Sequence, residues 1–367
     1  MNRAILPGVW QQCLKSLAVF LMYLLHSQLA FAAGGCGSAS LPFGAVDSVS
    51  SSREGQFRIG SVTKYTDFDN FREGADAVTN PGGNRAIITE STLFVDVGLS
   101  KRWVVTALVP YIKKKQQTNR FGKRIANGIG DITLLGSYDA ISSFSGGGEH
   151  SLSAQSLILG LGLKIPTGSI DEPGEKGVSL LPPAFQVGSG AFDLVPTVSY
   201  YKNVGAIALL GGVVWRIPLE KNKRGYRFGQ ELELNVGGEC TLRAWNNNVT
   251  LMLSASYLYA QYDTDSEFIL PARVRNGTKV LNTGGEFVDL VPGMRIRLSH
   301  RIGIEATVAL PIYENWNGDR ARNVGQVAPD WSTQIVLVYN FSRTKKELTR
   351  NSPPATIQRG LTRGNLQ

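Results

Sequence analysis

The feature that most constrains this chain is an apolar residue at every second position, repeated in segment after segment between residues 56 and 341. In the stretch 226–236, the side chains of Tyr226, Phe228, Leu232, Leu234 and Val236 fall on one face, and only Gln230 interrupts them. A period of two is that of a β-strand whose two faces meet different surroundings. The pattern therefore predicts an all-β protein.

Twelve such runs occur, at residues 56–66, 86–99, 103–112, 130–139, 154–165, 191–201, 204–216, 226–238, 249–261, 286–298, 302–310 and 331–341. Most are longer than the roughly five or six residues of a soluble strand and match the ~9–11 that cross a bilayer at a tilt. Hydrocarbon offers no hydrogen-bond partners, so a sheet within it must close on itself. The runs predict a transmembrane antiparallel up-and-down β-barrel of about twelve strands, spanning residues 56–341.

The connections between the runs alternate in length. Those after the second, sixth and tenth runs are brief, whereas long polar connections occupy residues 67–85, 113–129, 166–190, 262–285 and 311–330. Short turns on one rim and long loops on the other are typical of outer-membrane barrels, with both termini on the periplasmic side. A soluble β-sandwich would have shorter strands and no reason for this alternation.

The first 32 residues are typical of a secretory signal peptide. Arg3 and Lys15 precede an apolar centre at 17–25, and small residues follow at 30–34, which predicts cleavage after Ala32. The apolar run is about half of the ~20 residues that a spanning helix needs. The chain is expected to be exported, with residues 33–55 forming a periplasmic segment before the barrel.

The net charge of +9 is unevenly distributed. It falls to +7 without the signal peptide, and the tail 342–367 holds +5 from six basic residues and Glu347. About +2 is left on the body, so we expect no nucleic-acid partner and interpret the basic tail as disordered.

Two cysteines, Cys36 and Cys240, remain after the predicted cleavage. In an oxidising compartment they are able to form a disulfide. Cys36 could instead be lipidated as a new N-terminus, or both thiols could stay unpaired. The sequence is compatible with all three states.

If the apolar register faces lipid, the opposite register projects charged side chains into the lumen. These are Arg58, Lys64, Glu90, Asp96, Asp131, Lys164, Asp193, Arg216, Arg227, Glu231, Glu233, Asp289, Arg295, Arg297 and Glu305. Enclosed charges of both signs either pair with one another or line water. A plugging salt-bridge network and an open aqueous path are both compatible with this set. Twelve strands enclose more space than a filled eight-strand barrel and less than a sixteen-strand porin.

Catalytic chemistry has little support in the sequence. An outer-membrane phospholipase uses a serine and a histidine, for which Ser153 and His150 are candidates, but the predicted topology puts His150 beside a short turn, and His300 lies in another. The histidines and cysteines form no metal-ligand cluster, and Asp171, Glu172 and Glu175 are interpreted as solvated. We expect no enzyme and no cofactor. Besides a channel, a barrel with a structural or adhesive role is compatible with the pattern.

Several motifs at the strand ends carry a family resemblance. They are the residues at 109–111 (VPY), 128–132 (GIGDI), 163–168 (LKIPTG), 188–193 (GSGAFD) and 310–313 (LPIY). Over residues 57–341 the chain resembles the outer-membrane transporter family named for the meta-cleavage pathway of phenol degradation. The strand ending Tyr339-Asn340-Phe341 is similar to the aromatic signal read by the barrel-assembly machinery, although 26 residues follow it here.

The resemblance implies a twelve-strand barrel that passes small organic molecules. Together with the pattern, it predicts a channel in a Gram-negative outer membrane for passive or facilitated uptake of a small organic solute, aromatic or otherwise hydrophobic. The expected partners are outer-membrane lipid, that solute and, during biogenesis, the barrel-assembly machinery.

Overall fold

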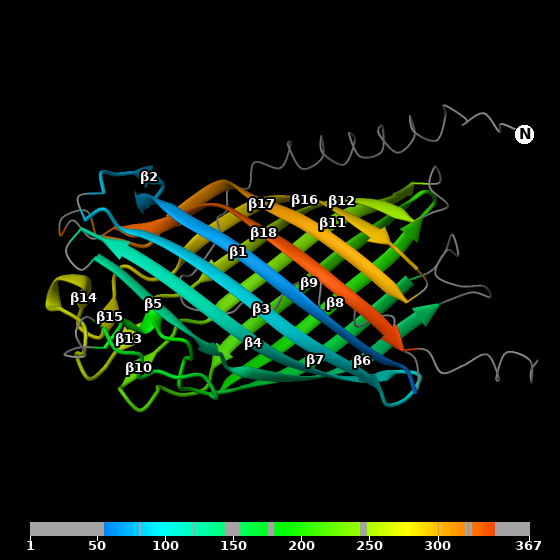
Figure 1. The fold of residues 1–367 in the computed structure, drawn as a ribbon, viewed down its shortest axis with the longest axis horizontal. Coiled ribbons are helices and arrows are strands. Elements are labelled where there is room, and N and C mark those ends of the chain that lie inside the picture. Colours follow the sequence, from blue (N-terminus) through cyan, green and yellow to red (C-terminus); the bar gives the residue numbers. More distant parts are fainter. Residues whose placement is uncertain are drawn as a thin grey trace, which may run out of the picture.

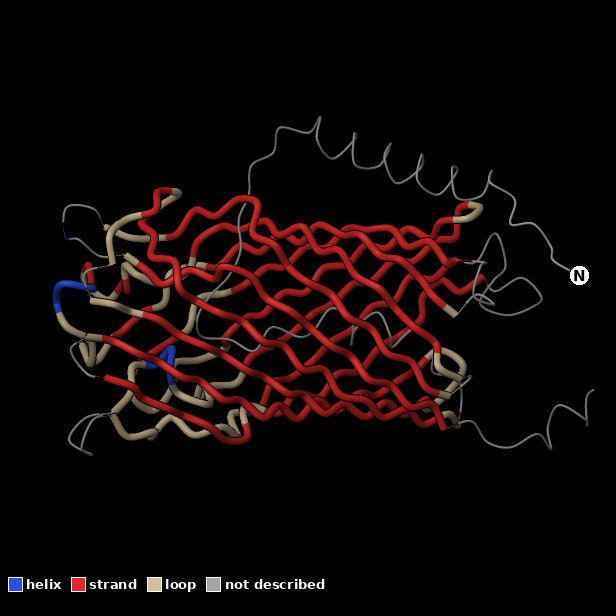
Figure 2. Tube along the Cα trace, turned by 45° about the horizontal axis from the view of Figure 1, so that its top comes forward, coloured by secondary structure: helices blue, strands red, loops and turns tan. Residues whose placement is uncertain are grey.

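The computed structural model describes residues 55–80, 82–119, 122–143, 155–174, 180–242, 248–299, 301–319, 322 and 325–341. Within these ranges, twelve long antiparallel strands lie side by side around a closed barrel (Figures 1 and 2). The barrel is closed by the pairing of β1 (Phe57–Glu73) with β18 (Gln326–Phe341), which runs from Phe57↔Phe341 to Arg72↔Gln326. The predicted all-β, up-and-down barrel is confirmed.

Each predicted run overlaps one barrel strand. Between β1 and β18 these strands are β3 (Arg85–Gly98), β4 (Trp103–Thr118), β6 (Ile132–Ser143), β7 (Gln155–Ile165), β8 (Asp193–Val204), β9 (Ile207–Pro218), β11 (Glu231–Leu242), β12 (Val249–Ala260), β16 (Gly285–Arg297) and β17 (Ile302–Trp316). The strands β1, β4, β17 and β18 extend beyond the predicted runs at one rim of the barrel. We call this end the long-loop rim and the opposite end the short-turn rim.

The long-loop rim, on the left in Figure 1, carries further short elements. There β5 (Gly122–Ile129) pairs with β4, and β2 (Asp76–Ala77) pairs with β1. A separate four-stranded sheet contains β10 (Tyr226–Arg227), β13 (Thr264–Asp265), β15 (Lys279–Val280) and β14 (Arg275–Asn276). The 3-10 helices η3 (Pro183–Phe185) and η5 (Ala272–Val274) lie in the long connections. Among the described residues, no helix has the length and apolar composition needed to cross a membrane.

The barrel has two chemically different faces. Along β4, the side chains of Val104, Thr106 and Leu108 are buried, whereas those of the alternate residues Trp103 and Val105 are exposed. Apolar side chains are exposed on the outer face in the other strands as well. Because exposed apolar area is unfavourable in water, this face requires an apolar environment.

The predicted run 226–238 is wrong over its first five residues. Instead of continuing the outer face, Tyr226 and Phe228 pack against Val280 in a cluster at the long-loop rim. A side chain on Gly229 would meet the backbone oxygen of Gln261 at 2.1 Å, so the chain crosses another loop here at close range. Alternation alone does not distinguish a barrel strand from a short strand in a loop.

The proposed signal peptide, the tail 342–367 and Cys36 lie outside the described residues, as do residues 33–54 of the N-terminal segment. These boundaries remain predictions. Cys240, in β11, is disulfide-bonded. Whether Cys36 is its partner also remains a prediction.

We predict that Gly60→Ala destabilises the barrel. A Cβ at Gly60 would lie 2.4 Å from the Phe94 ring and 2.4 Å from the Leu337 oxygen, whereas a Cβ at Gly303 meets nothing within 4 Å. The overpacking should lower the free energy of unfolding in detergent by about 1–3 kcal/mol. Gly303→Ala is the matched control in another strand and should be close to wild type. Equal stability of the two variants would contradict the close packing of Phe94 against β1.

Candidate functional site: the charged lumen

Fourteen charged side chains inside the barrel lie in three groups along its axis. The short-turn tier contains Arg58, Asp96, Glu239, Arg295 and Glu305. The middle tier contains Lys64, Glu90, Glu233 and Asp289. The long-loop tier contains Asp131, Lys164, Asp193, Arg216 and Glu231. Strand register fixes this order, since Arg58 pairs with Asp96 and Lys64 pairs with Glu90 six residues further along β1.

The short-turn tier contains two groups of paired charges. Arg58 pairs with Asp96, with Nε 2.6 Å from Oδ2, and Thr106 donates a hydrogen bond of 2.6 Å to the other carboxylate oxygen. Arg295 bridges Glu239 and Glu305 at 2.9 Å each. Because Arg58 and Asp96 are only 3% and 0% exposed, each charge depends on the other to offset its desolvation.

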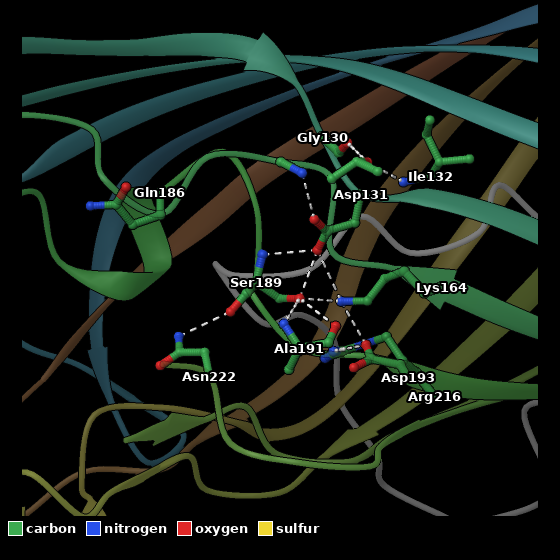
Figure 3. A network of polar contacts seen from close by, with 12 residues as sticks. Gly130, Asp131, Ile132, Lys164, Gln186, Ser189, Ala191, Asp193, Arg216 and Asn222 are labelled. Atoms are coloured by element: carbon green, nitrogen blue, oxygen red, sulfur yellow. Dashed lines mark hydrogen bonds and ion pairs between the residues drawn. The ribbon is translucent and has the colours of Figure 1, made fainter. Parts of the chain in front are cut away.

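Alternating charges also form a chain in the long-loop tier (Figure 3). Lys164 Nζ lies 3.2 Å from Asp131 and 2.7 Å from Asp193. Arg216 continues the chain from Asp193, at 3.0 Å, to Glu231, at 2.6 Å. Four neighbouring strands and the residue before β6 thus supply one buried network that ties this part of the wall together.

The same network holds the long connection between β7 and β8 against the inner wall. Asp131 accepts hydrogen bonds from the Ser189 backbone N–H at 2.8 Å and its hydroxyl at 2.6 Å, and from Gly168 N–H at 2.9 Å. Gly168 and Gly188 touch so closely that a Cβ on Gly188 would lie 2.3 Å from the Gly168 oxygen. Figure 3 shows these groups converging on Asp131.

A second set of contacts fastens the part of this connection around η3. Lys114 of β4 donates hydrogen bonds to the carbonyls of Ala184 at 2.9 Å and Gln186 at 2.8 Å. Beside it, Leu181 and Val187 pack on Ile112, on the same face of β4 as Lys114. We call residues 180–192 the inward loop. It narrows the lumen near the long-loop rim.

The middle tier differs because its side chains are only half-buried. Lys64 interacts electrostatically with Glu90, Glu233 and Asp289. Around the barrel, Glu233 in β11 is five strands from β1, so this interaction reaches across the lumen. Three carboxylates and one ammonium leave the tier with an excess of negative charge.

All the sequence-predicted lumen residues except Asp131 and Arg227 lie in barrel strands. Asp131 directly precedes β6 and joins the long-loop tier, whereas Arg297 is exposed at the short-turn end of β16. Arg227 was wrongly placed: it lies exposed in β10 and donates to the Pro218 carbonyl at 2.7 Å, because the chain leaves the barrel between β9 and β11. That the remaining side chains line an open path stays a prediction.

Lys114 was missed because the predicted third run ended at residue 112. The alternation that places Leu108 and Ile112 on the inner face continues to Lys114, so the sequence pattern could have predicted that Lys114 faces inward. Nothing in the sequence indicates that its partners are the carbonyls of a loop some 70 residues away.

Most residues of the candidate catalytic and cation sites are undescribed. His150, Ser153, Glu175 and His300 lie outside the described residues. Among the residues that are described, no group of three or more His, Cys, Asp or Glu side chains could hold a metal ion. Asp171 hydrogen-bonds to Lys223 and Arg224, which lower its pKa below the usual range.

At the long-loop rim, Asp263 is enclosed by the small sheet. It accepts hydrogen bonds of 2.6 Å from the Tyr226 hydroxyl and from the Gly229 backbone N–H. Burial outweighs these bonds and raises the pKa of Asp263 from 3.8 to about 6. The rim cluster therefore contains a carboxylate that resists ionisation.

Comparison with solved structures finds an outer membrane channel from Pseudomonas putida F1 with a TM-score of 0.58 and 12% sequence identity. The match covers 79% of this chain and 97% of that one. The translocator domain of autotransporter NalP from Neisseria meningitidis has a TM-score of 0.41 and 10% identity over 82% of this chain and 93% of that one. The toluene transporter TodX from Pseudomonas putida has a TM-score of 0.32 and 11% identity over 85% of this chain and 95% of that one.

At these identities the likeness to the Pseudomonas putida F1 channel is one of fold. No protein-family model matches the chain. No curated protein matches it either.

We predict that Lys164→Met destabilises the long-loop tier by about 3–5 kcal/mol, because Asp131 and Asp193 lose the buried cation between them. The loss should appear as a lower free energy of unfolding and as faster proteolysis of residues 166–192. Lys223→Met, which removes an exposed ion pair with Asp171, should leave the free energy of unfolding close to that of the wild type, because water screens exposed pairs. Adding Asp131→Asn to Lys164→Met should recover part of the loss. A Lys164 variant no weaker than the Lys223 variant would contradict the network.

We predict that the rim cluster around Asp263 loosens as pH rises. The folded-state pKa lies above the unfolded value, so its stabilisation is complete below about pH 4 and is lost as pH approaches 6. A difference of about two pKa units corresponds to about 3 kcal/mol. Hydrogen exchange of residues 226–229, corrected for intrinsic rate, should accelerate over this range. Asp263→Asn should remove the dependence, and its persistence in that variant would assign it to another group.

Proposed function

We propose that this protein is an outer-membrane channel of a Gram-negative bacterium for passive or facilitated uptake of small organic solutes, aromatic or otherwise hydrophobic. The observation that carries the proposal is the closed barrel with exposed apolar side chains outside and charged, partly accessible side chains inside. Such a cylinder satisfies its backbone hydrogen bonds internally while its outer face contacts lipid.

The likeness of fold to an outer membrane channel supports this function. In the proposed orientation, the short-turn rim faces the periplasm and the long-loop rim faces outward. The signal peptide 1–32 would direct export, and the barrel-assembly machinery would insert the chain. The proposed partners are therefore outer-membrane lipid and the solute, and the proposed activity is permeation rather than catalysis.

The three tiers have different roles in this proposal. The ion pairs of the short-turn tier and the long-loop tier brace the wall, and the inward loop sets the width available to solutes. The half-buried middle tier is the part of the charged lumen that is most accessible to a solute or ion. Its excess of carboxylates favours cations over anions.

Liposome swelling tests the proposed function directly. Purified protein in liposomes is compared over neutral, anionic and aromatic solutes of similar size, with protein-free liposomes as the control. We expect small organic solutes to enter faster with protein present. Entry at the protein-free rate for every solute, with the barrel folded, would favour a structural or adhesive role.

We predict that Glu233→Gln combined with Asp289→Asn weakens cation selectivity. The double variant leaves Lys64 facing Glu90 alone in the middle tier, so the excess negative charge there is removed. The reversal potential in a planar bilayer under a KCl gradient should shift toward zero. Asp171→Asn, at the exposed rim, is the control and should leave it unchanged. An unchanged reversal potential in the double variant would mean that ions do not pass the middle tier.

A further inference from the structure

The outer face of β4 changes character abruptly near the long-loop rim. Between the exposed aromatic residues Trp103 and Tyr111, the outward positions of the strand are all apolar: Val105, Ala107 and Val109. The eight steps from Trp103 to Tyr111 span roughly 26 Å along the strand and roughly 20 Å across a bilayer at a tilt of about 40°. Aromatic residues at the two edges of an apolar band mark the membrane interfaces. In the proposed orientation, Tyr111 therefore lies at the outer interface.

The next outward positions of β4 are basic. Lys113 is exposed and Lys115 is half-buried on this face, whereas Lys114 between them points inward and binds the inward loop. A run of three lysines is thus divided between the two faces of the strand. The two outward side chains begin immediately beyond Tyr111, at the level where lipid headgroups replace hydrocarbon.

The strand β5 adds a third lysine to the same face. It lies beside β4 (Figure 1), and residues directly opposite each other in an antiparallel ladder share a face. Lys123 is opposite Gln117 and diagonal to Lys115, so the Cβ atoms of the two lysines lie about 7 Å apart. Lys113 and Lys115 are separated by a similar distance along β4, at ~3.3 Å per residue. We call Lys113, Lys115 and Lys123 the lysine patch.

No carboxylate of the described chain neutralises the lysine patch. Within the described residues, no acidic side chain lies within ion-pair distance of these three ammonium groups. Arg85 of β3, opposite Gln117, is held instead by Asp67 at 2.8 Å and Asp69 at 3.5 Å. Like charges at neighbouring positions of a sheet are destabilising. An anion from outside the described chain would therefore stabilise the patch.

The same face continues toward the membrane with apolar groups. Ile129 is opposite Tyr111 and is 56% exposed. Asn127, opposite Lys113, donates a side-chain hydrogen bond of 3.3 Å to the Tyr111 hydroxyl, which holds that hydroxyl at the boundary between the apolar and basic parts. The surface thus fits an amphiphile whose anionic head meets the lysines and whose apolar part lies along the band below them.

We propose that the lysine patch binds the phosphate groups of a phosphorylated glycolipid in the outer leaflet, with Tyr111 and Ile129 contacting the start of its acyl chains. A phosphate group carries more negative charge than a carboxylate, so it matches several lysines better. Anionic headgroups attract basic side chains at a membrane surface by a factor of about five per lysine. The site rests on the outer-membrane orientation of the proposed function and goes beyond permeation by specifying a lipid partner.

Binding of lipid A, the glycolipid of the Gram-negative outer leaflet that carries two phosphates, tests the site. Protein refolded in a nonionic detergent contains no cellular lipid, and EDTA in every sample prevents divalent cations from bridging phosphate to Asp67 and Asp69. Native mass spectrometry then measures the dissociation constant of lipid A and of the same lipid without its phosphates. Inorganic phosphate is the third probe.

Three variants are compared with the wild type. The test variant removes the patch and carries Lys113→Gln, Lys115→Gln and Lys123→Gln. The conservative variant replaces the same three residues with arginine and keeps their charge. The matched control removes the same charge from exposed side chains at the short-turn rim and carries Lys101→Gln, Lys202→Gln and Arg301→Gln. Circular dichroism and heat-dependent gel mobility verify that each variant is folded.

We expect the wild type to bind lipid A at least about tenfold more tightly than the lipid without phosphates. The glutamine variant should lose roughly a hundredfold in affinity for lipid A, at a factor of about five for each lysine. The arginine variant and the matched control should both bind lipid A as tightly as the wild type.

Equal affinity of the folded glutamine variant and the wild type for lipid A would overturn the site. Equal affinity for the lipid with and without phosphates would also overturn it, as would binding of inorganic phosphate as tightly as lipid A, since the patch would then recognise the free ion. Failure of the channel function is a separate result. Wild-type protein that binds lipid A at the patch but admits no solute into liposomes would overturn permeation and leave the lipid site intact.

Discussion

Everything in this structure depends on the pairing of β1 with β18. That ladder extends from Phe57↔Phe341 to Arg72↔Gln326 and removes the free edges that an open sheet of this size would expose. Closure also creates the enclosed side on which Arg58, Asp96 and Asp193 are buried. Without it, the apolar outer face and the charged inner face would both be exposed to one solvent, and neither would be stable there.

Burial of the charges in the short-turn and long-loop tiers is tolerable because each of them lies beside a charge of opposite sign. Removing a single member leaves its neighbours uncompensated in a poorly solvated space. Lys164 shows this most clearly, since it separates two carboxylates and also hydrogen-bonds to Ser189 of the inward loop at 2.7 Å. The same interactions therefore brace the wall and hold the inward loop that narrows the lumen. The stability of the barrel and the width of its lumen are thus coupled.

The alternation in the sequence was sufficient to predict the barrel strands, because one face of every strand must be apolar whatever its neighbours are. It failed at Tyr226 and Phe228, where a rim loop buries the same residue types by local packing. The alternation also did not predict the inward loop, because the contacts of Lys114 and Asp131 join segments far apart in the chain.

The groups that obstruct the lumen lie on one side of it. The long-loop tier and the inward loop occupy the side of the lumen formed by β4 to β11. The opposite side, where β16, β17, β18 and β1 meet, carries the half-buried Lys64 and Asp289. Next to Lys64 along β1 begins an inner apolar cluster of Val62, Phe94, Leu108 and Val336. The two sides of the lumen therefore differ: the ion pairs and the inward loop lie on one, and half-buried charges beside an apolar stretch of wall lie on the other.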